Sequence, residues 1–426
     1  MTHYDPLLYT LSHFGQLLSH SEVLNRLFTG ICGFSRPVNQ GLWLRSSPSR
    51  AGLLSRLGFE KNDRYTSGVR TADFDYCLPP EFIAQTPLPE RDQSRLLVLK
   101  RADASVTHDR FRDLPGFLRP GDVLVLNDSR VLPARLRGTR PHTGGQIEIL
   151  LVEENMINDW WAMVRPGKRI RVGGDIHFPR RQNGAGAVTA TALEKNAEGL
   201  CRLRFHGTRD IVGELNSLGE VPLPPYISRE TPFTPTEDRQ RYQTVYARSA
   251  GSIAAPTAGL HFTETLLDEI RSRGAHVCFV TLHVGLGTFA PVKTEVLEEH
   301  VMHQESFRIT APVAEAVNAA RRSNRRVIAV GTTTVRVLET VAARSQGRLM
   351  ASEGRTGIFL YPPCNFRIVD GLLTNFHLPR STLLMLVSAF AAPGKPHGRE
   401  MILAAYAQAV RERYRFYSYG DAMLIL

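Results

Sequence analysis

The sequence predicts an α/β main domain with a mostly parallel sheet, plus an inserted small β-barrel domain. After the segment PLPPYISR at 222–229, strand candidates alternate with helices, which is typical of parallel strands joined by helical crossovers. Between about Gly138 and Leu218, short apolar segments are separated only by Gly, Pro and Asn turns, which favours a closed or half-closed barrel. We therefore expect the α/β domain at 69–137 and 219–426, and the barrel at 138–218.

The main domain begins with two apolar strand candidates, LLVLK at 96–100 and VLVL at 123–126. Its later strand candidates are VCFVTLHV, RVIAVG and GLLTNF, and helix-like segments lie between and after them. The expected helices cover about 263–274, 313–322, 334–343, 381–390 and 399–414. The barrel strands are expected in IEILLVE, WWAMVRP, AVTATAL and LCRLRFHG.

Composition excludes several classes of protein. With 42% hydrophobic and 22% charged residues, the chain matches ordinary globular proteins rather than disordered or fibrous ones. The longest apolar stretch, 383–393, is well short of the roughly 20 residues that span a bilayer, so no membrane association is expected. Five cysteines without a C-x-x-C pair suit a reducing cytosol, and we expect a cytoplasmic protein. The net charge of +11 is compatible with a polyanionic partner.

Residues 1–68 differ from the rest of the chain. They are rich in Ser and Arg, and no acidic residue occurs between Arg36 and Phe59. Such a leader is a targeting peptide, a disordered arm, or sequence translated upstream of the true start codon, and we favour the last.

Two motifs place a histidine near glycines and small residues. In AAPTAGLHFTETLL, His261 precedes a helix whose expected N-cap is Thr263. In VTLHVGLGTF, His283 ends a strand and two glycines follow it. Each histidine is a candidate for acid/base chemistry. Spacing alone favours a tight loop with small residues for packing in the first motif, and a simple turn is the alternative in the second.

Two further motifs join a strand to a helix. VIAVGTTTVRVLE carries Thr332, Thr333 and Arg336, and TNFHLPRSTL carries Asn375 and His377. If the two strands are parallel, both loops lie at the carboxyl end of the sheet, where α/β sheets bind ligands. The missing lysine argues against a phosphate-binding P-loop and favours a small polar ligand, while an ordinary threonine-capped helix remains the alternative.

Two weaker patterns complete the survey. His300, His303 and Glu305 in HVMHQE are metal-ligand types, but their spacing matches no zinc motif. YRFYSYGDAM surrounds Arg415 with aromatic residues and ends on Asp421. These aromatic rings either stack on bases or seal the end of the sheet.

Read in order, the motifs resemble one family closely. The matching segments are DFDYCLPPEFIAQTPLPERDQSRLL, GDVLVLNDSRVLPARL, GGQIEILL, PLPPYI, YQTVYA, AAPTAGLHFT, VTLHVGLGTF, RVIAVGTTTVRVLE, LLTNFHLPRSTLLMLVSAF and YRFYSYGDAM. Over about residues 70–426 they are similar to the S-adenosylmethionine:tRNA ribosyltransferase-isomerase family of the queuosine pathway. So many long motifs in one order are far more specific than any one alone.

The resemblance implies a reaction and its participants. The ribosyl part of S-adenosylmethionine is transferred to 7-aminomethyl-7-deazaguanine at the tRNA wobble position and isomerised, giving epoxyqueuosine, adenine and methionine. It implies no metal and no cofactor beyond S-adenosylmethionine as co-substrate. The expected partners are that tRNA and S-adenosylmethionine, and we expect a monomer.

Residue roles are hypotheses on this basis. His261, His283 or His377 supplies proton transfer, since only histidine titrates near neutrality without a large shift. Thr332, Thr333 and Arg336 hold the methionine carboxylate, Asp128 or Asp421 pairs an amine or ribose hydroxyls, and Asn375 lies in the same substrate site. The candidates for tRNA phosphate contact are Arg91, Arg95, Arg130 and Arg135.

The chain departs from the family pattern in two places. Family members begin close to the ADFDY element, so Val69 is a candidate first residue and 1–68 an artefact of start-site assignment. Pro363 occupies a position where the family carries glycine, and because proline fixes φ we expect an altered loop there. The competing hypotheses are a non-catalytic RNA-binding protein and a metal-dependent hydrolase built on His300, His303 and Glu305.

Overall fold

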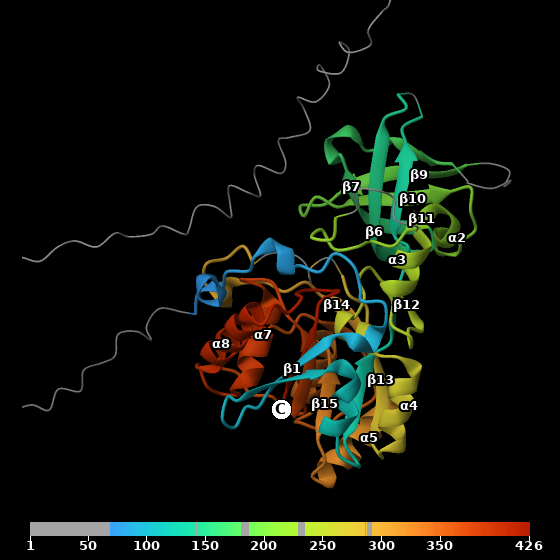
Figure 1. The fold of residues 1–426 in the computed structure, drawn as a ribbon. Helices are drawn as coiled ribbons and strands as arrows, with labels where there is room; N and C mark the ends of the chain where they lie inside the picture. The colour runs from blue at the N-terminus through green and yellow to red at the C-terminus, as the bar shows by residue number, and fades with distance from the viewer. Residues whose placement is uncertain (1–68, 142, 180–186, 229–234, 286, 288–291) are drawn as a thin grey trace, which may run out of the picture. The chain divides into compact units, whose positions relative to one another are not determined.

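The computed structural model describes residues 69–426, except 142, 180–186, 229–234, 286 and 288–291. The leader 1–68 expected from the sequence lies outside the described residues. Figure 1 shows a large sheet with helices beside it and a separate group of barrel strands, so the predicted fold class is confirmed.

Nine strands form the large sheet. They are β1 (Arg95–Leu99), β2 (Val106–Arg110), β3 (Val123–Asn127), β13 (His276–Leu282), β14 (Glu305–Ile309), β15 (Val327–Val330), β16 (Ser352–Thr356), β17 (Gly371–Asn375) and β18 (Ala422–Ile425). Their order is β16-β14-β13-β3-β15-β17-β18-β1-β2. Strands β13, β3, β15 and β17 are mutually parallel and β18 is parallel to β1, whereas β18 runs antiparallel to β17. The pairings at both outer edges of the sheet are antiparallel.

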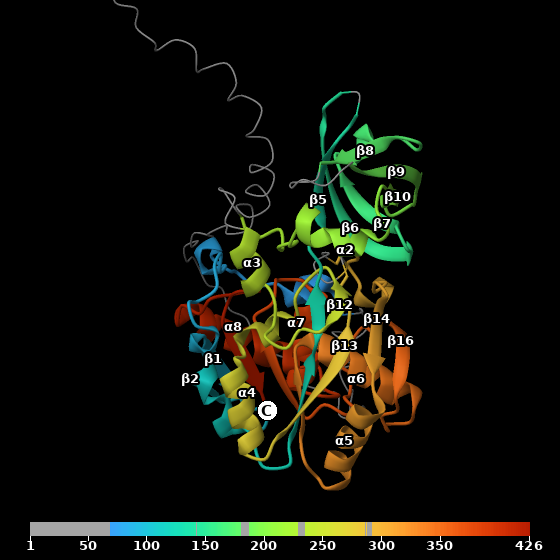
Figure 2. The same ribbon diagram turned by 90° about the vertical axis from the view of Figure 1, so that its right-hand side faces the viewer.

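Helices cover both faces of this sheet (Figures 1 and 2). They are α4 (Glu264–Ser272), α5 (Ala311–Arg322), α6 (Thr332–Arg344), α7 (Thr382–Ala391) and α8 (Gly398–Arg411). Because side chains alternate along a strand, Val123 and Val125 of β3 pack in one core with α5 to α8. Leu124 and Leu126 pack in a second core with α4. All five helices predicted from the sequence are present.

Six strands close into the barrel. They are β5 (Arg135–Thr139), β6 (Gln146–Met156), β7 (Asp159–Arg165), β8 (Asp175–Phe178), β9 (Val188–Lys195) and β10 (Cys201–His206), and β5 pairs with β8 to close the ring. Gly138 permits this closure, because a Cβ there would lie 2.6 Å from the Ile176 side chain. Helix α2 (Ile211–Leu218) packs on the barrel core, and β11 (Gly219–Glu220) pairs with β5.

Two short elements link these parts of the chain. Helix α3 (Pro235–Arg241) precedes β12 (Ser249–Ser252), which pairs in parallel with β4 (Ser129–Val131). No helix in the described part of the chain is long and apolar enough to cross a membrane.

Six strand ends meet at one end of the large sheet. The carboxyl ends of β13, β3, β15 and β17 lie there because these strands are parallel. The amino ends of β18 and β1 lie there too, since Asn375 pairs with Ala422 and Ala422 pairs with Leu96. We call this end the carboxyl end of the sheet, and the loops that leave it form the site described next.

Candidate active site

A pocket opens at the carboxyl end of the sheet. It is lined by 255–258, Val284, 331–333, 374–378 and Tyr417, among others, and its empty volume, part of it open to solvent, is about 640 Å³. The loops that carry Thr332 and His377 thus meet, as the parallel-strand argument predicted. We call this cavity the strand-end pocket.

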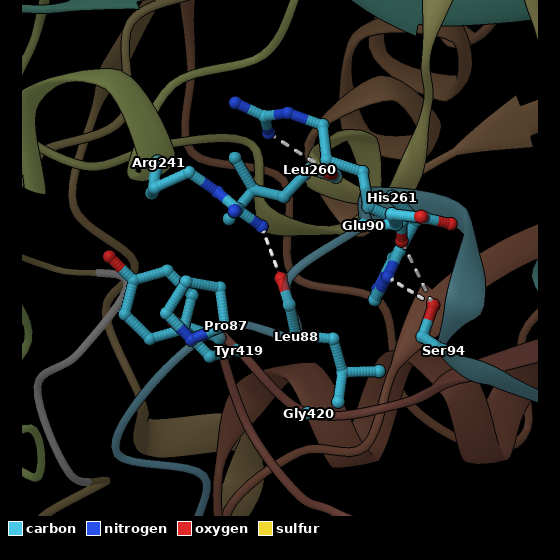
Figure 3. A pocket seen from close by; sticks show the side chains of 11 residues that line it. Pro87, Leu88, Glu90, Ser94, Arg241, Leu260, His261, Tyr419 and Gly420 are labelled. Atoms are coloured by element: carbon cyan, nitrogen blue, oxygen red, sulfur yellow. Dashed lines mark hydrogen bonds between the residues drawn. The ribbon is translucent and has the colours of Figure 1, made fainter. Parts of the chain in front are cut away.

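Asn375 connects the strand-end pocket to a buried histidine. Its Oδ1 accepts a hydrogen bond from Thr257 Oγ1 at 2.9 Å, and its Nδ2 lies 3.2 Å from His261 Nε2. His261 Nδ1 lies 2.7 Å from Ser94 Oγ, as Figure 3 shows. Four polar side chains from three separate segments of the chain therefore form one chain of hydrogen bonds.

This hydrogen-bond chain determines the protonation of His261. Because Asn375 Oδ1 accepts from Thr257, the Asn375 amide N–H is the donor toward His261 Nε2. The proton of the neutral His261 ring is therefore on Nδ1, which faces Ser94. Burial, with the cations of Arg91 and Arg415 nearby, lowers the pKa of His261 to about 3. His261 is therefore neutral at physiological pH, and both ring nitrogens are occupied by protein groups.

His377 differs from His261 in having one ring nitrogen without a protein partner. Its Nε2 lies 2.8 Å from Thr374 Oγ1, and no described residue bonds to its Nδ1. Its main chain is held firmly, because its N–H donates to the Tyr406 hydroxyl at 3.0 Å and its carbonyl accepts from Tyr76. Burial lowers the pKa of His377 to about 3. This neutral imidazole lines the strand-end pocket.

Asn127, at the end of β3, joins this strand to β13 and to the first turn of α6. Its Nδ2 donates to Leu282 O at 3.0 Å and to Thr333 Oγ1 at 3.3 Å, and its Oδ1 accepts from the N–H of Leu282 and of Ser129. Sequence analysis did not identify Asn127 or Ser94. The only signal for either was a polar residue at the point where an apolar strand ends or begins.

Helix α6 begins at the pocket, two residues earlier than predicted. Its N-cap is Gly331 at φ +84°, a conformation that favours glycine, and no side chain caps the first turn. Thr332 and Thr333 lie in that first turn and line the pocket. The helix therefore presents uncapped N–H groups and a partial positive charge near the pocket.

Arg336 lies one turn further along α6 and forms a buried ion pair with Glu305. The side chains are 4% and 3% exposed, and the other Glu305 oxygen, Oε1, accepts from Gly285 N at 2.9 Å. Arg336 Nε and Nη2 have no hydrogen-bond partner among the described residues. Arg336 does not line the strand-end pocket, so its predicted contact with a carboxylate stays a prediction.

The proposed metal ligands do not form a cluster. Within the described residues, no group of three or more His, Cys, Asp or Glu side chains is placed to hold a metal ion. Glu305 is bonded to Arg336 and Gly285, and His300 packs edge-on against Phe359. The described residues therefore do not favour a metal-dependent hydrolase.

His283 belongs to a different polar cluster. Its Nδ1 lies 2.9 Å from Ser129 Oγ, and the neighbouring Asp128 accepts from Thr281 Oγ1 at 2.7 Å. Burial lowers the pKa of His283, and Asp128 opposes that shift. Neither His283 nor Asp128 lines the strand-end pocket. The three histidines grouped by sequence analysis thus divide into two sets.

Asp421 is buried at the start of β18. Its two oxygens accept the backbone N–H groups of Arg95 and Arg415, both at 2.8 Å. Burial raises its pKa. The aromatic residues before it are also buried, and Phe416 packs against Phe376 and Tyr406. Of the two interpretations of this segment, these contacts favour sealing the end of the sheet.

The four arginines predicted to contact tRNA differ in what holds them. Arg91 donates to the carbonyls of Leu260 and Gln240, at 3.0 and 2.8 Å. Arg95 donates to Glu412 O at 2.6 Å and lies over the Tyr414 ring, and Arg135 donates to Leu223 O at 3.3 Å. The fourth, Arg130, is exposed, and no described residue pairs with its guanidinium. Arg91 also lines a second pocket of about 310 Å³ beside His261, together with Arg241, Ser94 and Tyr419 (Figure 3).

Pro363 lies outside the pocket. It is exposed, in the loop that leads to three successive N–H groups, of Arg367, Ile368 and Val369. These N–H groups donate to the buried carboxylate of Glu339, at 2.7 to 3.1 Å. Glu339 therefore fixes the end of the loop in which the family pattern is altered.

Comparisons with known proteins identify the family of this chain. A family model described as queuosine biosynthesis protein matches residues 71–425. An S-adenosylmethionine:tRNA ribosyltransferase-isomerase from Carboxydothermus hydrogenoformans is 52% identical over 84% of this chain and 100% of its own length. One from Staphylococcus haemolyticus is 49% identical with the same coverage. The crystal structure of S-adenosylmethionine tRNA ribosyltransferase from Thermotoga maritima is 36% identical, covers 83% of this chain and 100% of that one, and has a TM-score of 0.46.

Proposed function

The chain belongs to the queuosine biosynthesis protein family, and from this we infer that it is a tRNA-modifying transferase and isomerase. It transfers the ribosyl moiety of S-adenosylmethionine onto 7-aminomethyl-7-deazaguanine at the tRNA wobble position and isomerises it. The products are epoxyqueuosine, adenine and methionine. The observation that carries the proposal is the family match over 71–425, which includes every loop that forms the strand-end pocket.

S-adenosylmethionine occupies the strand-end pocket in this proposal. The uncapped first turn of α6 suits the methionine carboxylate, with the hydroxyls of Thr332 and Thr333 beside it. The apolar part of the lining, which includes Val284 and Phe376, suits a ligand that carries both a ribose and a purine. No cofactor other than this co-substrate is needed, and the enzyme acts as a cytosolic monomer.

His377 is the proposed proton acceptor. The sulfonium of S-adenosylmethionine acidifies the adjoining C5′–H, and a neutral imidazole with an unoccupied nitrogen can accept that proton. His377 meets both conditions, since its pKa is low and Nδ1 has no partner among the described residues. His261 then orients Asn375 toward the pocket instead of exchanging protons itself.

The two competing functions are less well supported. A non-catalytic RNA-binding protein does not require a pocket lined by a neutral histidine and the uncapped N–H groups of a helix. A metal-dependent hydrolase would require ligands that Glu305 and its described neighbours do not supply.

The test is a single incubation. Purified protein is mixed with S-adenosylmethionine and tRNA that carries 7-aminomethyl-7-deazaguanine, and adenine release and the mass of the modified nucleoside are followed. Adenine that appears together with epoxyqueuosine is the expected result. Folded protein that binds the tRNA but releases neither product would refute the proposal.

A further inference from the structure

A cluster of positive charges lies on the barrel, away from the residues considered so far. The segment 165–172, between β7 and β8 (Figure 2), reads RPGKRIRV, and we call it the basic turn. Its four cationic side chains, Arg165, Lys168, Arg169 and Arg171, belong to exposed residues. Between them Ile170 is only 2% exposed and packs in the barrel core.

The basic turn is fixed in position by hydrogen bonds. Arg169 N donates to Pro166 O at 3.1 Å, and Gly174 N donates to Arg171 O at 2.9 Å. The Lys195 ammonium donates to Gly167 O at 2.9 Å, which adds a fifth cation and ties β9 to the turn. Together with the buried Ile170, these hydrogen bonds fix the backbone of the turn with its cationic side chains pointing outward. Binding a ligand therefore costs little conformational entropy in the backbone of the turn.

No acidic side chain among the described residues neutralises the basic turn. Glu148 lies opposite Arg165 in the β6–β7 register, but its carboxylate faces Arg137 and Arg135. Of the other nearby acids, Glu194 pairs with Arg202 and Asp175 accepts from Thr191. By contrast, Arg271, Arg273 and Arg322 are exposed arginines that form ion pairs, with Asp268, Glu269 and Glu315.

Two exposed apolar side chains adjoin these charges. Val172 is 62% exposed and Leu193 is 37% exposed. The N–H of Gly173 donates to Ala192 O at 2.7 Å, which brings the ends of the two segments side by side. A rigid surface of cations that no described acidic side chain neutralises fits a chain of phosphates, and the small apolar side chains can contact its riboses.

We propose that the basic turn binds the sugar–phosphate backbone of the tRNA substrate. The inference rests on the proposed function, because that function makes tRNA the polyanion this protein must hold. Lys168, Arg169 and Arg171 contact phosphates and release their counterions, which contributes affinity and orientation without selecting a sequence. The barrel thereby acts as an RNA-binding module, while chemistry takes place at the carboxyl end of the sheet.

The experiment compares two variants of equal charge in the full-length protein. One carries Lys168→Gln, Arg169→Gln and Arg171→Gln. The matched control carries Arg271→Gln on α4, Arg273→Gln at its C-cap and Arg322→Gln on α5. Thermal unfolding verifies that both variants fold. Affinity for a fluorescently labelled tRNA transcript is measured by anisotropy at several salt concentrations, from about 50 to about 200 mM.

The basic-turn variant is expected to bind tRNA about ten- to a hundredfold more weakly, with a salt slope shallower by about one for each phosphate that it no longer binds. KM for S-adenosylmethionine stays unchanged, and the control binds tRNA nearly as the unaltered protein does. Equal weakening in the two variants, or none in either, would overturn the inference. Absence of turnover in the unaltered protein would instead refute the proposed function, since anisotropy reports binding without chemistry.

Discussion

The carboxyl end of the sheet and the basic turn use polar groups in opposite ways. At the carboxyl end of the sheet, Asn375, His261 and Ser94 are buried and bonded to one another. On the basic turn, Lys168 and Arg171 are exposed, and no described residue pairs with them. The first arrangement fixes donors for one small ligand, and the second leaves charges available to a long polyanion. Substitution should therefore affect turnover at the first region and salt-dependent affinity at the second.

The largest effect should come from His377→Gln, which removes the imidazole from the strand-end pocket. We expect kcat to fall about 10²- to 10⁴-fold, the usual contribution of a general base, while tRNA affinity is retained. Steady-state adenine release measures the change. The control is His108→Gln, whose ring bonds only Tyr414 and Gln408 among the described residues. A loss of the same size in the control would remove His377 from the chemistry.

Next comes Arg336→Met, which tests whether Arg336 is structural or binds substrate. It leaves the Glu305 carboxylate buried without its cation, so the free energy of unfolding should fall by about 3–5 kcal/mol. Urea unfolding measures this loss. Combining it with Glu305→Gln should restore part of the stability. If KM for S-adenosylmethionine rises about tenfold in the stabilised double variant as well, the predicted carboxylate contact gains support.

A somewhat smaller effect is expected for Asn375→Ala, which cuts the link between Thr257 and His261. Turnover should fall about a hundredfold because the pocket wall loses its orientation. The matched control is Asn318→Ala, since Asn318 is also buried and bonds Leu349 through both amide atoms, at 2.8 and 3.0 Å. The control should lose stability but keep its activity per folded molecule. Activity that survives in Asn375→Ala would contradict the positioning role.

The smallest effect concerns stability in acid. His261 and His377 have pKa values of about 3 when folded and near 6.5 when unfolded, so the unfolded chain binds more protons as the pH falls through 6.5. Each histidine should therefore lower stability by about 2 kcal/mol at pH 5 relative to pH 7 or above. Urea midpoints between about pH 5 and 7.5 measure this. In His377→Gln the dependence should be about half as steep, and an unchanged slope would show that His377 is not held neutral.

Much of the fold was predictable because strands and helices are specified by sequence patterns a few residues long. Apolar runs predict the strands around VLVL, VCFVTLHV and VIAVG. A single hydroxyl residue before a helix predicts the N-cap at Thr263, whose Oγ1 accepts a hydrogen bond from Leu266 N at 3.1 Å. Parallel strands then placed Thr332 and His377 together, as expected. The antiparallel pairing of β14 with β16 at one edge of the sheet is harder to predict, because many residues separate these two strands.

The site was predicted less well because the role of a polar side chain depends on which residues it contacts in the fold. Nothing in the sequence shows that Ser94 lies against His261, or that Asn127 bonds both β13 and α6. The sequence likewise does not show which groups an arginine side chain contacts. The Arg91 guanidinium bonds backbone carbonyls, whereas the Arg169 guanidinium has no partner among the described residues, and the sequence does not distinguish the two arginines. Which arginines contact tRNA stays a prediction until binding is measured.

The position of β18 has a consequence for synthesis on the ribosome. This strand lies between β17 and β1, yet it is translated after every other strand of the sheet. Until it emerges, the apolar strand β1 has no neighbour on that side, and its pairing with Leu424 and Ile425 cannot form. Nascent chains therefore expose an unfinished sheet edge that invites aggregation. Synthesis of β18, rather than growth of the N-terminal half of the chain, completes the sheet that carries the site.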